Sequence, residues 1–181
     1  MKQSFVFSGS GGQGIMSAGI MLAHAAIDMG KHATFLPEYG PEQRGGSAKC
    51  TVIISDDEII SPLTKKCDNL VVLNSIAYNK FADTVKEGGR LIANSSLIPA
   101  DISREGIKSI AVPVDNIALE VGSLKVANVV IIGVLIGATG VVSKEVFVKS
   151  LEEKFKAKKP EILEMNMKAL EKGIAFGQQM K

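Results

Sequence analysis

The chain has 181 residues, of which 46% are hydrophobic and 22% are charged, and its formal net charge is +2 at pH 7. This length and composition favour one globular domain over residues 1–181 and exclude a disordered chain, a collagen-like chain and a disulfide scaffold. The balance of 21 basic against 19 acidic residues argues against a nucleic-acid partner, because phosphate neutralisation needs a clustered basic surface.

The first part of the chain predicts strands around a single helix. Residues 3–8 have the pattern of a strand that ends in glycines, residues 13–29 that of a helix, and residues 33–36 that of a second strand. A loop rich in glycine and proline over residues 37–46 then leads into a third strand over residues 48–55. A parallel crossover usually needs a dozen or more residues and a helix. The second and third strands are therefore not expected to be neighbouring parallel strands.

The rest of the chain predicts further strands and then helices. The expected strands are residues 69–74, 90–94 and 109–114, and the expected helices are 76–86, ended by Gly88-Gly89, followed by 116–121, 126–136, 144–155 and 161–178. We therefore expect an α/β fold: a three-layer, Rossmann-like open sheet, mostly parallel with some mixed strand pairing, plus C-terminal helices.

Residues 126–143 carry no charge, which raises the question of a membrane span. Polar side chains and three glycines within this stretch, and the absence of a second such stretch, favour a buried core or interface helix instead. No signal-peptide pattern precedes the first strand. No CxxC spacing is present, so Cys50 and Cys67 are expected to be core thiols of a cytoplasmic protein rather than metal or cluster ligands.

The segment Gly9-Ser10-Gly11-Gly12-Gln13-Gly14 matches G-x-G-x-x-G between a predicted strand and a predicted helix. Glycines let the backbone approach an anion, and the helix N-terminus supplies unpaired N–H groups. A tight turn with no ligand is the competing interpretation. A dinucleotide site would also want an acid after the second strand, and Glu38 lies near that position but within the loop over residues 37–46.

That loop, Pro37-Glu38-Tyr39-Gly40-Pro41-Glu42-Gln43-Arg44-Gly45-Gly46, is the second candidate segment. It gathers two acids, one of three arginines and one of two tyrosines in a stretch stiffened by proline. Loops of this kind often carry function. The alternative is a surface hairpin whose Glu and Arg pair with each other.

Other polar residues give weaker signals. Ser8, Asn74 and Asn94 end predicted strands, and the two asparagines favour a role as helix caps or turn formers. His24 and His32 adjoin no nucleophile motif, so both are expected to be solvated or structural.

The combination of GSGGQG with PEYGPEQRGG resembles the gamma subunit of 2-oxoacid:ferredoxin (acceptor) oxidoreductases, over essentially the whole chain. Lys125-Val126-Ala127-Asn128, which leads into an apolar helix, is also similar to this family. A short free-standing chain with this loop most resembles the 2-oxoglutarate branch, with pyruvate and branched-chain 2-oxoacid enzymes as close alternatives.

The resemblance implies a subunit of an enzyme that decarboxylates a 2-oxoacid on thiamine diphosphate and transfers the acyl group to coenzyme A. Electrons would pass through iron–sulfur clusters to ferredoxin or another acceptor. The diphosphate cofactor, magnesium and the clusters would be held by alpha, beta and delta (ferredoxin-like) subunits. This chain would bind no cofactor stably on its own and would cap the active site near coenzyme A.

The resemblance also implies site residues, which form two groups. The glycine loop would comprise Gly9, Gly11, Gly12, Gln13 and Gly14, and the loop facing the catalytic chains would comprise Glu38, Tyr39, Gly40, Pro41, Glu42, Arg44, Gly45 and Gly46. Asn128 would line the same cleft, Arg44 and Glu42 are the expected active-site contacts, and no metal ligand is expected. Two alternatives stay open: a small NAD(P)-binding dehydrogenase domain with Glu38 on the ribose, and a purely structural assembly subunit.

Overall fold

The computed structural model describes residues 1–40, 46–98 and 101–180. Its elements are β1 (Lys2–Ser10), α1 (Ile15–Asp28), β2 (His32–Tyr39), β3 (Ser47–Ser55), β4 (Cys67–Val72), α2 (Ser75–Phe81), η1 (Ala82–Thr84), β5 (Val85–Asn94), β6 (Lys108–Val112), α3 (Val114–Val121), η2 (Leu124–Val126), α4 (Ala127–Thr139), α5 (Lys144–Phe155) and α6 (Pro160–Gln179).

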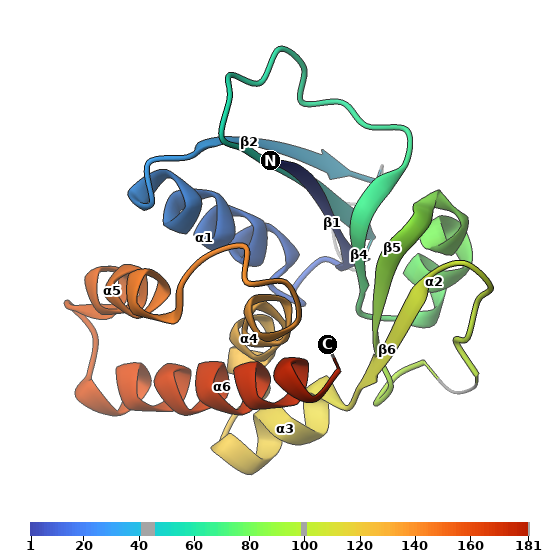
Figure 1. The fold of residues 1–181 in the computed structure, drawn as a ribbon. Coiled ribbons are helices and arrows are strands. Elements are labelled where there is room, and N and C mark those ends of the chain that lie inside the picture. Colours follow the sequence, from blue (N-terminus) through green and yellow to red (C-terminus); the bar gives the residue numbers. More distant parts are fainter. Residues whose placement is uncertain (41–45, 99–100, 181) are drawn as a thin grey trace.

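A six-stranded sheet in the order β2-β3-β1-β4-β5-β6 forms the centre of the molecule (Figure 1). β1, β4, β5 and β6 pair in parallel, whereas β3 runs antiparallel to both of its neighbours, β2 and β1. The mostly parallel α/β sheet with some mixed pairing is thus confirmed. β2 and β3 are neighbours joined as an antiparallel hairpin, which agrees with the absence of a crossover helix between them.

Alternate side chains of the central strands enter two separate cores. Phe5, Phe7 and Val71 face the side covered by α1 and α4, while Val6 and Leu70 face the side covered by α2. Because successive residues of a strand point to opposite faces, this alternation gives the three layers that the sequence predicts. Figure 1 shows α1, α4 and α6 on one side of the sheet and α2 on the other.

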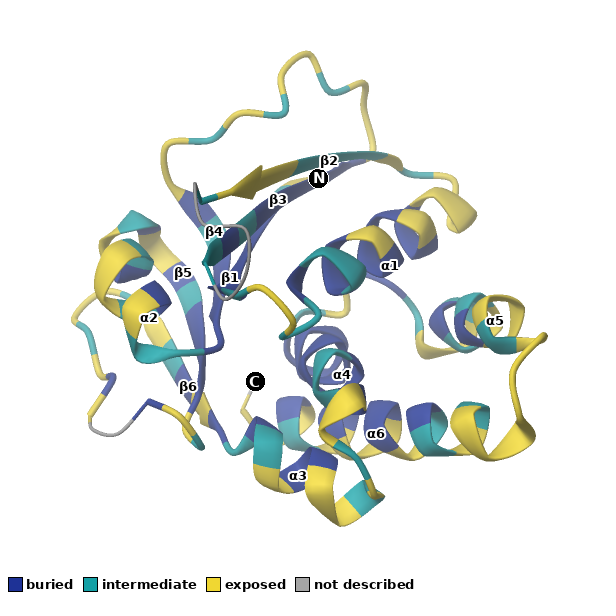
Figure 2. Ribbon diagram, turned by 180° about the vertical axis from the view of Figure 1, so that it is seen from behind, coloured by how far each residue is buried: buried dark blue, intermediate teal, exposed yellow. Residues whose placement is uncertain are grey.

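Helix α4 is the most buried helix of the chain, as its dark colour in Figure 2 shows. It packs against α6 through glycines four residues apart on both helices, Gly133 and Gly137 facing Gly173 and Gly177. A Cβ at Gly133 would lie 2.5 Å from the Leu170 carbonyl oxygen, so only glycine allows this approach of the two backbones. The uncharged stretch is confirmed as a buried core helix, since α1, α3 and α6 of the same chain contact it.

Several predicted boundaries are wrong, and two of them change the interpretation of the chain. The second strand runs on to Tyr39, so Glu38 is a strand residue and not a loop residue. The helix predicted to end at Gly88-Gly89 stops at Phe81, and both glycines lie inside β5, where pairing of Cys67 with Val85 recruits the segment into the sheet. Tertiary strand pairing here overrides the local helical pattern.

Candidate functional site

The glycine segment connects β1 to α1 at the carboxyl end of the parallel strands. Gly12 and Gly14 have φ of +95° and +76°, a backbone region that favours glycine. Gly14 is the N-cap of α1 and has no side chain to cap it, which leaves N–H groups of the first helical turn open to a ligand. A Cβ at Gly14 would lie 2.9 Å from the Cβ of Asn128, so glycine also permits the close approach of α4.

Side-chain amides fix the shape of this loop. The Ser10 N–H donates to Gln13 Oε1 at 2.7 Å, and Asn74 Nδ2 donates to the same oxygen at 3.0 Å. Asn74 Oδ1 in turn accepts from the Ala77 N–H at 2.9 Å and caps α2. The predicted cap at Asn74 is confirmed. The glycine loop is therefore held to β4 and α2 by hydrogen bonds rather than by packing alone.

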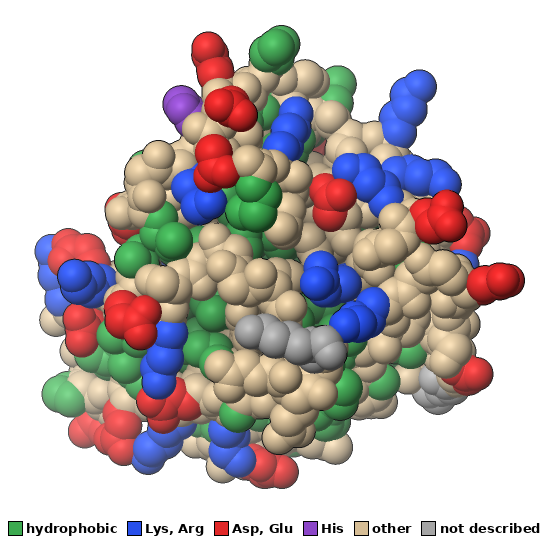
Figure 3. Space-filling view, in the orientation of Figure 1, with side chains coloured by type: hydrophobic (Ala, Val, Ile, Leu, Met, Phe, Trp, Pro, Cys, Tyr) green, Lys and Arg blue, Asp and Glu red, His purple; other side chains and the backbone are tan. Residues whose placement is uncertain are grey.

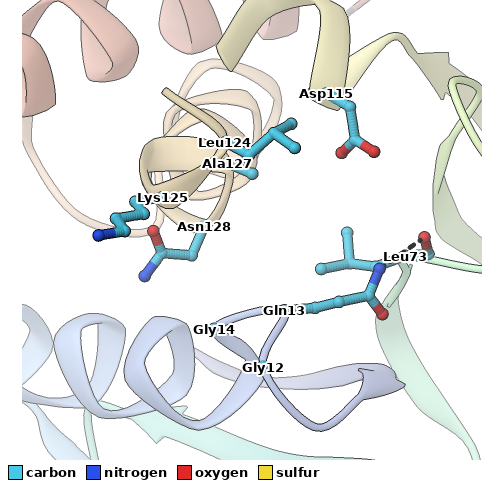
Figure 4. Close-up of a pocket in the computed structure, with 9 residues that line it drawn as sticks. All are labelled: Gly12, Gln13, Gly14, Leu73, Asp115, Leu124, Lys125, Ala127 and Asn128. Carbon is cyan, nitrogen blue, oxygen red and sulfur yellow. Dashed lines mark hydrogen bonds between the residues drawn. The ribbon is translucent and has the colours of Figure 1, made fainter. Parts of the chain in front are cut away.

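A cavity of about 340 Å³ opens above the glycine loop, against η2 and α4 (Figure 4). Its lining residues are Gly12, Gln13, Gly14, Leu73, Asp115, Leu124, Lys125, Ala127 and Asn128. Figure 4 shows Lys125 and Asn128 at one end and Asp115 at the other. Within the described ranges, the Lys125 ammonium has no ion-pair partner. The pocket thus combines backbone donors, one cation, one carboxylate and a small apolar surface, which suits a polar ligand that carries an anion.

The structure brings together Gly12, Gln13, Gly14 and Asn128 of the predicted site. Gly9 lies behind the loop, where a Cβ would meet Gln13 Oε1 at 2.6 Å. Two further glycines of the predicted site are bonded to each other: the Gly11 N–H donates to the Gly46 carbonyl oxygen at 3.0 Å. This bond places the end of the β2–β3 hairpin beside the glycine loop. The predicted residues Pro41, Glu42, Arg44 and Gly45 lie outside the described residues.

Glu38, Tyr39 and Gly40 do not line the cavity. Glu38 forms an ion pair with Lys49 of β3 at 2.6 Å, and the Tyr39 side chain is largely exposed. The Gly40 N–H donates to the Ser47 carbonyl oxygen at 2.7 Å and closes the hairpin. Glu38 is therefore engaged elsewhere than at the pocket, which removes the geometric support for a dinucleotide ribose contact.

Asp115 is the pocket residue that sequence reasoning missed. It lies in the first turn of α3, shortly after β6, and acidic residues are common at helix starts, so its position in the sequence indicates no particular function. Topology supplies the missing information: β6 is parallel to β5, so residues after β6 reach the same sheet edge as the glycine loop. Lys125 was noted in the sequence only as the first residue of Lys125-Val126-Ala127-Asn128. The structure places it in the lining of the pocket.

Other reactive groups lie away from this pocket. Both cysteines are buried and free, and burial raises the pKa of the Cys50 thiol to about 12 and that of the Cys67 thiol to about 11. His24 and His32 are exposed on α1 and β2. Over residues 1–40, 46–98 and 101–180, no three His, Cys, Asp or Glu side chains are grouped as a metal site.

On the face drawn in Figure 3, basic and acidic side chains are interspersed and form no single basic patch. Among the described residues, no helix combines the length and the apolar character that a membrane span requires.

The fold and the pocket define a mixed α/β domain whose glycine loop opens a polar pocket at the carboxyl edge of its sheet. The profile of the family described as pyruvate ferredoxin/flavodoxin oxidoreductase matches residues 4–176, so the chain belongs to that family. The predicted resemblance to the gamma subunit of 2-oxoacid:ferredoxin oxidoreductases is thereby confirmed.

Relatives with different substrates in their names match this chain. The 2-oxoglutarate synthase subunit KorC of Methanocaldococcus jannaschii is 40% identical and covers 83% of this chain and 82% of its own. The ketoisovalerate oxidoreductase subunit VorA of Methanothermobacter thermautotrophicus is 38% identical over 95% of this chain. This chain spans only 36% of that VorA protein.

Two solved structures share the fold over nearly the whole chain. The keto/oxoacid ferredoxin oxidoreductase gamma subunit from Geobacter sulfurreducens has a TM-score of 0.86 and 36% identity, and the match covers 100% of this chain and 99% of that one. The 2-oxoglutarate:ferredoxin oxidoreductase from Magnetococcus marinus, solved with 2-oxoglutarate, coenzyme A and succinyl-CoA bound, has a TM-score of 0.92 and 26% identity. That match covers 98% of this chain and 31% of the longer one.

Proposed function

We propose that this chain is the gamma subunit of a coenzyme A-dependent 2-oxoacid:ferredoxin oxidoreductase and that its pocket holds an anionic part of coenzyme A. One observation carries the proposal: the glycine loop, the uncapped start of α1, Lys125 and Asn128 converge on one cavity. A helix N-terminus with open N–H groups and a nearby cation is a favourable site for a phosphate group. The relative from Magnetococcus marinus, solved with coenzyme A bound, has the same fold.

The proposal assigns the redox chemistry to partner chains. The described residues offer no cluster of metal ligands, and both thiols are buried with raised pKa values, so they do not fit magnesium or an iron–sulfur cluster. Thiamine diphosphate, magnesium and the clusters then belong to alpha, beta and delta subunits, with ferredoxin as the acceptor. This chain's share of the work is to bind and orient coenzyme A at the cleft that the partner chains complete.

The substrate is proposed to be 2-oxoglutarate, converted to succinyl-CoA and CO₂. The KorC relative from Methanocaldococcus jannaschii, named for 2-oxoglutarate, is 40% identical to this chain, whereas the PorC relative from the same organism, named for pyruvate, is 30% identical, which supports 2-oxoglutarate over pyruvate. The test is to isolate the assembled enzyme anaerobically and to measure dye reduction with 2-oxoglutarate, pyruvate and 2-oxoisovalerate. Each substrate is assayed with and without coenzyme A. Reduction that depends on coenzyme A and is fastest with 2-oxoglutarate is the expected result.

Lys125→Ala tests the role of the pocket itself. Loss of one charge-assisted hydrogen bond is worth about 1.5 kcal/mol, so the KM for coenzyme A should rise about tenfold while the KM for the 2-oxoacid stays unchanged. Lys168→Ala is the matched control, because Lys168 lies on the exposed side of α6 and pairs with Glu164 at 2.6 Å. Equal coenzyme A kinetics for wild type and Lys125→Ala would contradict the proposed pocket, and reduction without coenzyme A would contradict the enzyme class.

A further inference from the structure

The carboxylate of Asp115 faces the pocket from the end opposite Lys125 (Figure 4). Its Oδ1 accepts a hydrogen bond from Asn94 Nδ2 at 3.0 Å. Within the described part of the chain, no protein donor contacts its second oxygen, Oδ2. The wall of the pocket therefore presents one strong, negatively charged acceptor that the protein itself leaves open.

The orientation of the Asn94 amide is fixed by the backbone. Asn94 is buried, and its Oδ1 accepts from the N–H groups of Ser96 and Val114, each at 3.2 Å. Backbone N–H groups only donate, so this oxygen cannot exchange places with Nδ2. Nδ2 must then donate, and its acceptors are Asp115 Oδ1 and the Leu73 carbonyl oxygen. Asp115 Oδ1 is consequently fixed as an acceptor, which orients the carboxylate so that Oδ2 is left to the pocket.

The two ends of the pocket thus have opposite polarity. Lys125 and the start of α1 favour an anion at one end, and the Asp115 carboxylate repels an anion at the other end. A ligand with an anion at each end, such as a 2-oxo dicarboxylate, is disfavoured. A ligand with an anion at one end and a hydroxyl or amino donor at the other is favoured.

On this basis, which rests on the proposed function, we propose that Asp115 is a specificity-determining residue that accepts a hydrogen bond from the nucleotide part of coenzyme A. The adenosine of coenzyme A offers the required chemistry, since it carries hydroxyl and amino donors a short distance from its phosphates. Phosphate lies toward Lys125 and the glycine loop, and the neutral donor lies toward Asp115. The 2-oxoacid binds elsewhere in the assembled enzyme.

Asp115→Asn provides a polarity test that keeps the local fold. Asn94 Nδ2 needs an oxygen to donate to, so the oxygen of the new side chain stays with Asn94 and its NH₂ group faces the pocket. The open acceptor Oδ2 is thus replaced by an NH₂ donor, which faces the donor of the coenzyme A nucleotide and cannot bond to it. In the assembled enzyme we expect the KM for coenzyme A to rise about tenfold or more, with the KM for the 2-oxoacid unchanged.

Two further measurements complete the test. The inhibition constant of 3′-phosphoadenosine 5′-diphosphate, the nucleotide fragment that lacks the pantetheine arm, should rise by the same factor. Asp115→Ala, which leaves Asn94 Nδ2 its bond to the Leu73 carbonyl, should also raise both constants. The control is Glu120→Gln on the same helix, because Glu120 pairs with Lys172 at 2.8 Å outside the pocket lining and loses the same charge.

The outcomes separate this inference from the proposed function. If Lys125→Ala raises the coenzyme A KM and neither Asp115 variant does, the role of Asp115 is overturned and the proposed function stands. If coenzyme A kinetics change but inhibition by the fragment does not, the donor is not on the nucleotide and the inference is overturned. If none of the Lys125 or Asp115 variants affects coenzyme A kinetics, the pocket is not the coenzyme A site and both proposals are overturned.

Discussion

The contact between α4 and α6 yields a quantitative prediction for Gly133→Ala. The added Cβ would lie 2.5 Å from the Leu170 carbonyl oxygen and 3.0 Å from the Cα of Gly173, and both obstacles are backbone atoms. Because backbone cannot move aside alone, the two helices must separate, and overpacking of this kind costs about 3 kcal/mol. Alanine also stabilises a helix over glycine by about 1 kcal/mol. The expected net loss is therefore about 2 kcal/mol.

Urea unfolding followed by circular dichroism measures this loss directly. With an m-value of about 2 kcal/mol/M, the midpoint should fall by about 1 M. Gln178→Ala, on the exposed side of α6, is the control and should stay within about 0.5 kcal/mol of wild type. A midpoint for Gly133→Ala that is equal to or higher than that of wild type would refute the packing argument. Helix propensity alone predicts a higher midpoint, so such a result would mean that the added Cβ meets no serious clash.

Three further predictions concern single side chains. Cys50 and Cys67 should both resist a thiol reagent at pH 8 in the folded chain and react on unfolding, and rapid labelling of either folded thiol would contradict their burial. Desolvation raises the pKa of Asp68, but hydrogen bonds from Lys86 and from a serine of β1 outweigh it, and the pKa lies below its ordinary value. This stabilisation is full above the unfolded pKa of about 3.9 and disappears as pH falls through the folded value, so Asp68→Asn should flatten the acid side of the stability curve measured by urea titration. Asn74→Ala removes the α2 cap and should lower the free energy of unfolding, measured by urea titration, by at least about 1 kcal/mol; Asn74→Asp keeps the cap oxygen but loses the Nδ2 donor to Gln13 Oε1, so it should recover only part of this loss.

Local sequence patterns were sufficient to predict the position of the glycine loop and to exclude a parallel connection between the second and third strands. The succession of strand, glycines and helix needs only neighbouring residues to be recognised, and the structure has this order, although β1 runs on to Ser10 and α1 starts at Ile15 rather than at residue 13. The ten-residue length of the predicted loop, residues 37–46, was enough to exclude a parallel crossover between the second and third strands. The β5 start at Val85 was not predictable in this way, since it depends on pairing with Cys67, a residue far from it in sequence.

The pocket illustrates the same limit. Gly12, Gln13 and Gly14 are found from a motif, but Asp115 is an isolated carboxylate with no diagnostic spacing. Asp115 lies in the pocket because β4, β5 and β6 are parallel neighbours, and this order brings the segment after β6 to the edge of the sheet where the glycine loop lies. Sheet order arises from long-range contacts, so a residue of this kind is recognised only once the topology is known.

The β2–β3 hairpin is coupled to the glycine loop through its end at Gly46. Gly40 and Gly46, at its two ends, are anchored by backbone hydrogen bonds to Ser47 and Gly11. Because Gly11 belongs to the glycine loop, a shift of the Gly46 anchor would also move the backbone that opens the pocket.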